Sequence, residues 1–161
     1  MIEDQDEAEW ERRYRRSYPS VYRALVATLL DADLASDALQ DAFLAGLRRP
    51  PANDANIAGW LFRVAVRKAG RARRRWRWLP LDAAANVSAE ASQIDALLDQ
   101  LSVGQLLRLL TARQRSIVVA YFYLDQTQEQ IAELLGIRRG TVAATISQAL
   151  TSMRKGEGHV Q

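Results

Sequence analysis

The chain has 161 residues, of which 48% are hydrophobic and 25% charged, as is typical of a folded soluble protein. It has no cysteine and one histidine, His159, so disulfides and thiolate metal sites are excluded and histidine chemistry has one residue to use. No apolar run reaches roughly 18 residues and the first residues are acidic, so we expect neither a membrane span nor a signal peptide. These features predict a cytoplasmic protein that is not an enzyme and holds no cofactor or metal ion.

The charges are distributed unevenly along the chain, although the net charge is only +3. Six of the first eleven residues are acidic, whereas residues 55–81 contain no acid and eight bases. Residues 82–100 contain four acids and no base, and residues 101–155 contain seven bases and three acids. Two basic blocks, mostly of arginine, predict a polyanionic partner that is contacted at two places. A solvated helix face is the alternative interpretation of the block at 63–77.

Helical spacing of apolar residues dominates the first half, and no alternating strand pattern is present. The predicted elements there are helices over residues 14–29 and 34–47, a turn at 31–33, a loop at 52–55 and a third helix from Ile57 into the arginine block. Arg49, Pro50 and Pro51 should end the second helix, because proline disfavours helix in the residue before it.

The second half is also predicted to be helical. Its elements are helices over residues 94–110, 112–123 and 128–135, a last helix from Gly140, and a tail from Gly156. The segment between the halves is rich in Ala, Ser and Asn and has little apolar periodicity, which indicates a flexible linker. We therefore predict an all-α fold with two small helical domains. Its parts are an acidic N-terminal tail (1–11), a first domain (12–81), the linker (82–93), a second domain (94–155) and a C-terminal tail (156–161).

A helix-turn-helix is predicted near the end of the chain. Thr127 and Gln130 fit a capping box at the start of a short helix, and Gly136 fits a left-handed turn at its end. Ala132 and Val142 stand where this motif places a small residue that lets the helices approach and an apolar residue that packs them together. An ordinary helical hairpin in a core is the alternative interpretation.

Residues exposed near the start of the second helix of this motif would face the major groove of DNA. They are Arg138, Arg139, Thr141, Ala144, Thr145 and Gln148. The arginines can reach phosphate or guanine, the hydroxyl and amide groups can make polar contacts, and the alanine can contact a thymine methyl. This surface is sparse, so we expect weak, salt-sensitive binding that needs help from a partner.

Two sets of residues recur together in one known family. The set in the second half is Leu110, Gln114, Arg115, Ile131, Ala132, Leu135, Gly136, Gly140, Thr141, Val142, Ala149 and Arg154. The set in the first half is Tyr18-Pro19-x-Val21-Tyr22, residues 35–44 and Trp60-Leu61-Phe62-Arg63-Val64-Ala65. In this order and spacing they resemble regions 4 and 2 of the extracytoplasmic-function (ECF) sigma factors of the sigma-70 family.

The resemblance implies a transcription initiation factor that binds core RNA polymerase. In the family, region 2 opens and reads the promoter −10 element, and region 4 reads the −35 element. The resemblance places polymerase contacts at Asp37, Gln40, Asp41 and Phe43. Asp33, Asp37 and Asp41 also stand four residues apart on one predicted helix face, and a metal site is the alternative interpretation of this row.

The resemblance also assigns the −10 element to the loop before the third helix and to that helix. The residues are Asn53, Asn56, Trp60, Arg63, Arg67, Lys68, Arg71 and Arg74. Opened DNA needs a basic groove for its backbone and polar or aromatic pockets for unstacked bases, and these residue types supply both. Trp60 fits a core position equally well, and Trp76 and Trp78 can stack on bases or pack the end of the domain.

The chain departs from the family pattern at several positions. Arg67 and Arg71 stand where the family usually has Asn and often has Asp, which makes this −10 region more basic. The recognition helix carries fewer bases than the family tends to have, and Arg138 replaces its usual serine N-cap. Thr111 replaces a family proline and can itself cap the helix that follows.

Three functions fit these features to different degrees. The first is a sigma factor that binds core RNA polymerase and promoter DNA, with an anti-sigma factor as a further partner. The second is a sigma-like protein that occupies an anti-sigma factor or polymerase without reading promoters. The third is a stand-alone helix-turn-helix regulator, which leaves the acidic row and the arginine block unexplained. A nuclease has least support, because no catalytic cluster or Gly-rich phosphate loop is present.

The acidic tail is expected to screen the arginine block or to be disordered.

Overall fold

A computed structural model describes residues 2–52, 54–76 and 102–158 of the chain. Every regular element in these three ranges is a helix, which confirms the predicted all-α class. The elements are α1 (Ile2–Leu29), α2 (Ala32–Arg48), the 3-10 helix η1 (Asp54–Asn56), α3 (Ile57–Trp76), α5 (Ser102–Arg108), α6 (Ala112–Phe122), α7 (Gln128–Leu135) and α8 (Arg139–Glu157). The predicted linker at 82–93 lies outside the described residues, as do Asn53, Trp78 and the side chain of Trp76.

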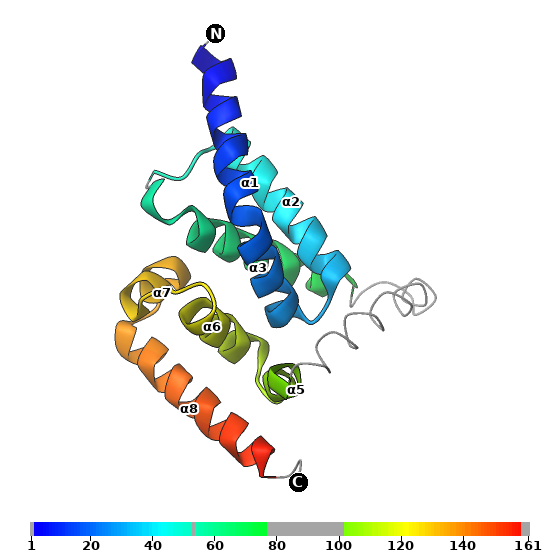
Figure 1. Cartoon of the computed structure of the whole chain (residues 1–161), viewed down its shortest axis with the longest axis vertical. Helices are drawn as coiled ribbons and strands as arrows, with labels where there is room; N and C mark the ends of the chain where they lie inside the picture. The colour runs from blue at the N-terminus through cyan, green and yellow to red at the C-terminus, as the bar shows by residue number, and fades with distance from the viewer. Residues whose placement is uncertain (1, 53, 77–101, 159–161) are drawn as a thin grey trace.

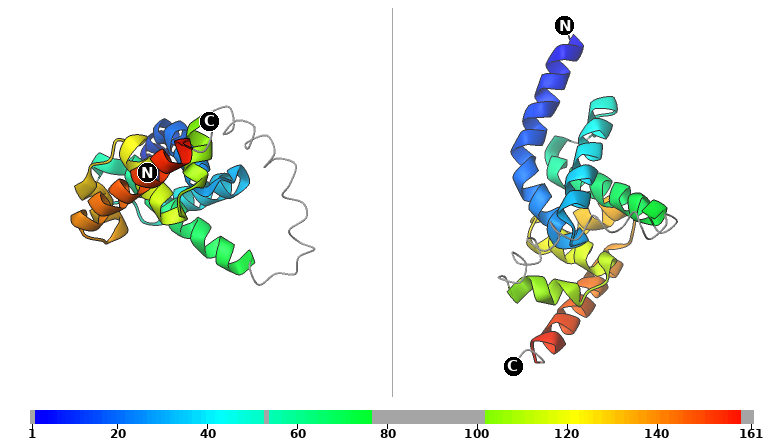
Figure 2. Two further views of the ribbon diagram at one scale, coloured as in Figure 1. Left: turned by 90° about the horizontal axis from the view of Figure 1, so that it is seen from below. Right: turned by 90° about the vertical axis from the view of Figure 1, so that its right-hand side faces the viewer.

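The helices form two groups that follow one another along the long axis of the molecule (Figure 1 and Figure 2). In the first group, α1, α2 and α3 all pack against one another. In the second group, α8 packs against α5, α6 and α7. The N-terminal end of α1 and the C-terminal end of α8 lie at opposite ends of the molecule (Figure 1).

Local sequence explains where α2 begins and which face it buries. The Asp31 carboxylate accepts a hydrogen bond from the Leu34 backbone N–H at 2.9 Å and so caps the helix. The buried face consists of Ala35, Ala38, Leu39, Ala42 and Gly46. Because four of these five residues have a methyl group or no side chain, α1 and α3 can pack closely on this face.

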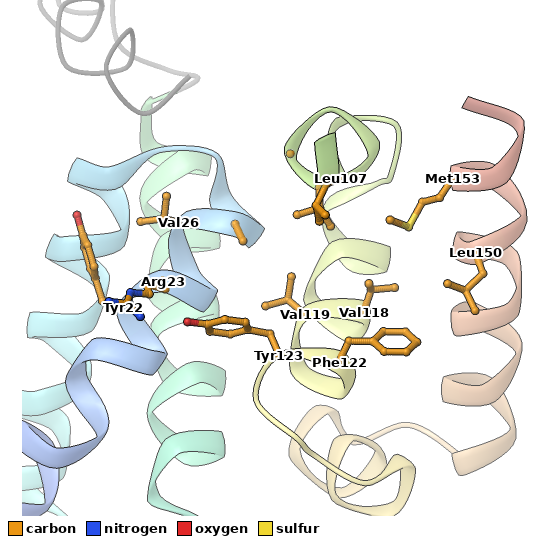
Figure 3. Close-up of a pocket in the computed structure, with 13 residues that line it drawn as sticks. Tyr22, Arg23, Val26, Leu107, Val118, Val119, Phe122, Tyr123, Leu150 and Met153 are labelled. Atoms are coloured by element: carbon orange, nitrogen blue, oxygen red, sulfur yellow. The ribbon is translucent and has the colours of Figure 1, made fainter. Parts of the chain in front are cut away.

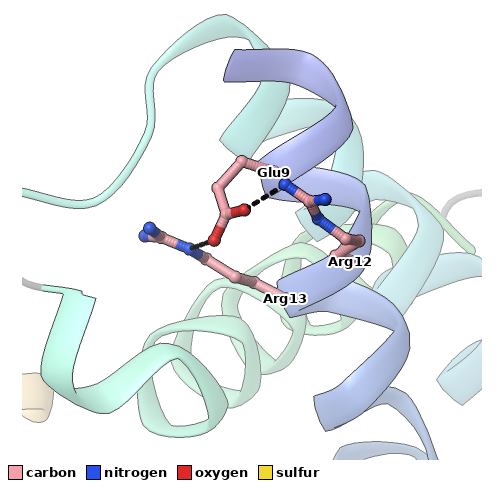
Figure 4. Close-up of polar contacts among 3 residues, drawn as sticks. All are labelled: Glu9, Arg12 and Arg13. Atoms are coloured by element: carbon pink, nitrogen blue, oxygen red, sulfur yellow. Dashed lines mark hydrogen bonds and ion pairs between the residues drawn. The ribbon is translucent and has the colours of Figure 1, made fainter. Parts of the chain in front are cut away.

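The acidic N-terminal segment is helical, so the prediction of a tail over residues 1–11 is wrong from Ile2 onward. Glu9 forms ion pairs with Arg12 and Arg13, at 2.5 and 2.8 Å, within the first turns of α1 (Figure 4). Exposed pairs of this kind stabilise a helix only slightly. The stronger support is Trp10, which is 5% exposed and packs against α2 and α3.

The helix-turn-helix is confirmed in its local geometry. Thr127 and Gln130 form the predicted capping box, and Gly136 ends α7 with a φ of +64°, in the left-handed region. Val142 is fully buried, as expected for the residue that packs α8 onto the rest of the motif. The alternative of an ordinary hairpin does not explain why the N-terminal part of α8 is exposed on its other side.

The structure also tests the predicted start of α6, the predicted end of α8 and the predicted extent of the helix before α6. Thr111 caps α6 with a complete capping box, as its residue type predicts. α8 continues to Glu157, so the tail predicted from Gly156 begins later. The helix predicted over residues 94–110 is described only from Ser102, as α5.

The two groups of helices are joined through the C-terminal end of α1. Arg115 of α6 is 9% exposed; its Nε donates to the Thr28 carbonyl oxygen at 2.8 Å and its Nη1 to the Leu110 carbonyl oxygen at 2.7 Å. Arg73 of α3 donates to the Leu29 carbonyl oxygen. Because the last carbonyls of a helix have no partner within it, the two guanidinium groups supply the missing donors and complement the helix dipole.

Replacing Arg115 by Ala is expected to lower the free energy of unfolding by roughly 2–4 kcal/mol, because two buried carbonyl oxygens lose a charged donor. Urea unfolding followed by circular dichroism measures this change. Arg113→Ala is the matched control, because Arg113 is exposed and lies two residues earlier in the same helix. Equal midpoints for the two variants would show that Arg115 does not join the two groups of helices.

Candidate nucleic-acid interface

α3 carries a row of arginines along one side. Arg63, Arg67, Arg71 and Arg74 follow at steps of four, four and three residues, which places them on one helix face. The last three are exposed, whereas Arg63 is half-buried and its Nε has no hydrogen-bond partner among the described residues. Burial, followed by the charge of Arg67, lowers the pKa of Arg63. A row of exposed guanidinium groups suits the backbone of a single-stranded nucleic acid.

The predicted −10 residues at the start of α3 face the other half of the molecule. Asn56 Oδ1 accepts a hydrogen bond from the Gly59 backbone N–H at 3.1 Å, and Asn56 Nδ2 donates one to Gln126 Oε1 at 2.5 Å. Trp60 and Arg63 line a cleft of about 290 Å³ together with Asn56 and three residues of α7. The end of α3 that is predicted to read bases therefore contacts the C-terminal helices.

Gly59 allows Gln126 to approach α3. A Cβ atom at Gly59 would lie 2.6 Å from Asn56 Nδ2 and 2.7 Å from Gln126 Oε1, closer than non-bonded atoms tolerate. Gln126 is 7% exposed, and its Nε2 donates to the Leu124 carbonyl oxygen at 3.1 Å. Both polar atoms of the Gln126 amide are therefore engaged, and a side chain at position 59 would have to displace the amide groups of Asn56 and Gln126 from this contact.

The acidic row lines one groove, as its four-residue spacing predicts. Asp33, Asp37 and Asp41 of α2 lie on one side of this groove of about 530 Å³, and Lys68 and Arg73 of α3 lie on the other. Lys68, predicted to contact the −10 element, thus lies beside the acidic row. Among the described residues, no group of three His, Cys, Asp or Glu side chains is arranged to hold a metal ion.

The four predicted polymerase-binding residues differ in exposure. Gln40 is exposed on α2, as are the two aspartates. Phe43 is half-buried, and its ring centroid lies 4.5 Å from that of Tyr14 and 6.4 Å from that of Trp10. Burial, followed by the neighbouring Tyr18, raises the pKa of Tyr14 to about 12. Phe43 therefore belongs to an aromatic cluster inside the first group of helices.

The start of α8 presents the predicted reading surface. Arg138, Arg139, Thr141, Ala144 and Gln148 are exposed, and Thr145 is half-buried. Arg138 is the N-cap residue and makes no side-chain cap hydrogen bond. Arg139 Nε pairs with Glu129 Oε1 at 2.9 Å, and Thr145 Oγ1 donates to the Thr141 carbonyl oxygen at 2.8 Å. Two polar groups of this surface are therefore already engaged within the helix-turn-helix.

An apolar cleft of about 690 Å³ lies between α1 and the C-terminal helices (Figure 3). Val26 of α1, Leu107 of α5 and Met153 of α8 point into it from three sides (Figure 3). Phe122 and Tyr123 line it and are 54% and 46% exposed. Exposed aromatic rings in an apolar cleft are typical of a surface that a partner covers.

Several similarities connect this chain to known proteins. The family profile described as Sigma-70, region 4 matches residues 100–153, which include the helix-turn-helix. The ECF RNA polymerase sigma factor SigM of Mycobacterium tuberculosis is 26% identical over 96% of this chain and 80% of its own length. The ECF RNA polymerase sigma factor SigL of the same organism is 30% identical over 77% of this chain and 75% of its own length. This chain belongs to the ECF sigma factor family.

The fold of this sigma factor agrees with its family. The sigma factor RpoE of Bartonella quintana, solved in complex with the anti-sigma factor NepR, has a similar fold with a TM-score of 0.66 at 15% identity. The match covers 91% of this chain and 95% of that chain. Because the similarity to SigM spans both halves, a stand-alone helix-turn-helix regulator is not favoured. None of the helices in the described ranges is long and apolar enough to cross a membrane.

Sequence reasoning missed the residues that connect the two surfaces predicted to contact DNA. Gln126 and Gly59 carry no local signal for their contact, because the Asn56–Gln126 bond joins residues 70 positions apart. Arg115 matches the family pattern, but its partners are backbone carbonyls, which any residue can supply. Trp10 had a usable signal, since it precedes Tyr14 by four residues and so extends the apolar face of the first predicted helix.

Replacing Gly59 by Ala should lower the free energy of unfolding of the sigma factor by about 1 kcal/mol or more relative to Gly70→Ala. Both glycines lie in α3 and both variants gain helix propensity, but no described atom outside that helix's own backbone lies within 4 Å of a Cβ at Gly70. Thermal unfolding compares the two variants. Adding Gln126→Ala should recover part of the stability, and equal stability of the two glycine variants would contradict the contact.

Proposed function

We propose that this sigma factor binds core RNA polymerase and directs it to promoter DNA, with residues 12–81 at the −10 element and residues 94–155 at the −35 element. The distribution of charge carries this proposal: α2 presents an acidic row, while α3 and the start of α8 present arginines in the two halves. An acidic face suits a basic protein surface, whereas arginine-bearing helix faces suit DNA.

Opening of the −10 element is proposed to use α3 and the end of η1 that precedes it. The exposed Arg67, Arg71 and Arg74 would hold the backbone of the opened strand, and Trp60 and Asn56 would contact unstacked bases. The protein then exchanges duplex stacking for contacts with its own side chains. It supplies no catalytic group and no cofactor in this scheme, because polymerase performs the chemistry in the cytoplasm.

Reading of the −35 element is proposed to use the exposed start of α8, with Arg138 as its main cation. Arg139 already forms an ion pair with Glu129, and the Thr145 hydroxyl already donates a hydrogen bond to the helix backbone. Few groups are left to read base edges, so this helix alone would bind DNA weakly. Tethering to polymerase raises the effective concentration of such a weak site, which explains how a sparse surface suffices.

An anti-sigma factor is proposed as a further partner. NepR is bound to the Bartonella quintana sigma factor that shares this fold. In this chain the apolar cleft with exposed Phe122 and Tyr123 is the surface that suits such a protein.

Co-elution of the purified chain with bacterial core RNA polymerase tests the proposed function. We expect a stable complex, and we expect Asp37→Arg with Asp41→Arg to weaken it at least tenfold, because the change places cations against a basic partner. Asp4→Arg with Asp6→Arg is the matched control, since these exposed residues of α1 give the same change in net charge. A folded chain that never co-elutes would remove the initiation role, and equal weakening in both variants would place the contact elsewhere.

Arg138→Ala with Arg139→Ala should lower occupancy of the −35 element and flatten the salt dependence of binding. The slope of log K against log salt should change by about two units at most, one for each phosphate that an arginine neutralises. Because Arg139 also pairs with Glu129, the change should lie nearer one unit. Anisotropy with a promoter selected by the holoenzyme measures the slope, and Arg12→Ala with Arg15→Ala is the control. An unchanged slope would mean that neither arginine binds phosphate.

A further inference from the structure

The N-terminal end of α1 carries a buried aromatic residue to which the proposed function assigns no role. Trp10 is 5% exposed, although acidic residues flank it in the sequence. Its Nε1 donates to the Phe43 carbonyl oxygen at 3.1 Å. Its ring lies beside the Phe43 ring, with 6.4 Å between centroids and 15° between planes. A directional bond and a near-parallel ring hold the indole in one orientation on α2.

α2 provides a socket for this ring at Gly46. Gly46 is buried in the helix, and a Cβ atom at this position would overlap the Trp10 ring. Glycine weakens a helix interior relative to alanine. The close approach of the indole accounts for a glycine at this point of α2.

The same indole contacts Trp60 of α3. The two rings meet edge to face, with 5.7 Å between centroids and 89° between planes. Trp60 is half-buried and also lines the cleft that contains Asn56 and Arg63. The side chain proposed to meet an unstacked base is therefore fixed on one side by Trp10 and faces the cleft on another.

We propose that Trp10 is a positioning residue for −10 recognition, which acts by fixing the Trp60 ring beside Asn56 and Arg63. This inference rests on the proposed function of the first half of the chain. A buried ring does not itself reach DNA, so the effect passes through Trp60. A ring that is already fixed pays no ordering entropy when a base binds, whereas a rotating ring does. Removal of Trp10 therefore weakens the steps that use Trp60 and spares those that use α8.

The test uses the full chain assembled with core RNA polymerase. Wild-type holoenzyme first selects a promoter from a pool of random double-stranded DNA, and all variants are compared on that fragment. Three quantities are measured: the affinity for core polymerase, protection of the −35 duplex, and the amount of opened DNA from permanganate reactivity of unpaired thymines.

Two variants disturb the Trp10 packing in different ways. Trp10→Phe removes the N–H and shrinks the ring, and Gly46→Ala pushes the intact ring out of its socket. Each should reduce the fraction of opened DNA by roughly two- to tenfold, the effect of one aromatic contact, with core affinity and −35 protection unchanged. Val21→Ala is the control for reduced stability, because Val21 is fully buried in the same helix.

A double variant decides whether Trp10 acts through Trp60. In a Trp60→Ala background, Trp10→Phe should cause no further decrease in opened DNA. An additive decrease in opened DNA would overturn the positioning role. The role would also be overturned if a Trp10 or Gly46 variant lost as much affinity for core polymerase as a Val21→Ala chain with the same melting temperature. Unchanged opening in both single variants would overturn it as well. A wild-type chain that forms no holoenzyme or selects no promoter would instead refute the proposed function, and the positioning role with it.

Discussion

The arrangement of the molecule depends on one cation placed where a helix ends. Arg115 donates to the Thr28 carbonyl oxygen of α1 from α6, in the other half of the chain. Burial and then the charge of Arg73 disfavour the guanidinium cation, and both lower its pKa. The helix dipole and two directional bonds to carbonyl oxygens offset this cost. Because α6 also packs against α7 and α8, this bond and the contacts of α3 with α7 together determine where the helix-turn-helix lies relative to α3.

Features that a few neighbouring residues determine could be predicted from the sequence. Thr127 and Gln130 define the start of α7 by their hydrogen bonds, and Gly136 defines its end by its backbone angle. The identities of these three residues were therefore sufficient to predict both ends of the helix. The helical N-terminus was not predicted, because its acidic composition outweighed the apolar spacing of Trp10 and Tyr14. Tertiary packing of one indole decided the outcome there.

Contacts between the halves could not be predicted, since they pair residues far apart in the sequence or use backbone atoms. The Asn56–Gln126 bond spans 70 positions, and the partners of Arg115 are carbonyl groups that every residue carries. The candidate site likewise has one part that the sequence predicts and another that depends on tertiary packing. Arg67 and Arg71 are exposed, as expected for residues predicted to contact DNA, whereas the placement of Lys68 beside the acidic row required the packing of α3 on α2.

In the proposed function, the bond between Asn56 and Gln126 competes with binding of an opened DNA strand at α3. Gln126 occupies one side of the Asn56 amide, so a base that needs that side must displace it. Binding at α3 and docking of the two halves are then linked with opposite sign. The apparent affinity for an opened strand equals the intrinsic affinity reduced by the fraction of molecules in which Gln126 has withdrawn. A ligand that binds better when the helix-turn-helix has moved away from α3 therefore raises the affinity of the protein for an opened strand. By reciprocity, a bound strand raises the affinity of the protein for that ligand by the same factor.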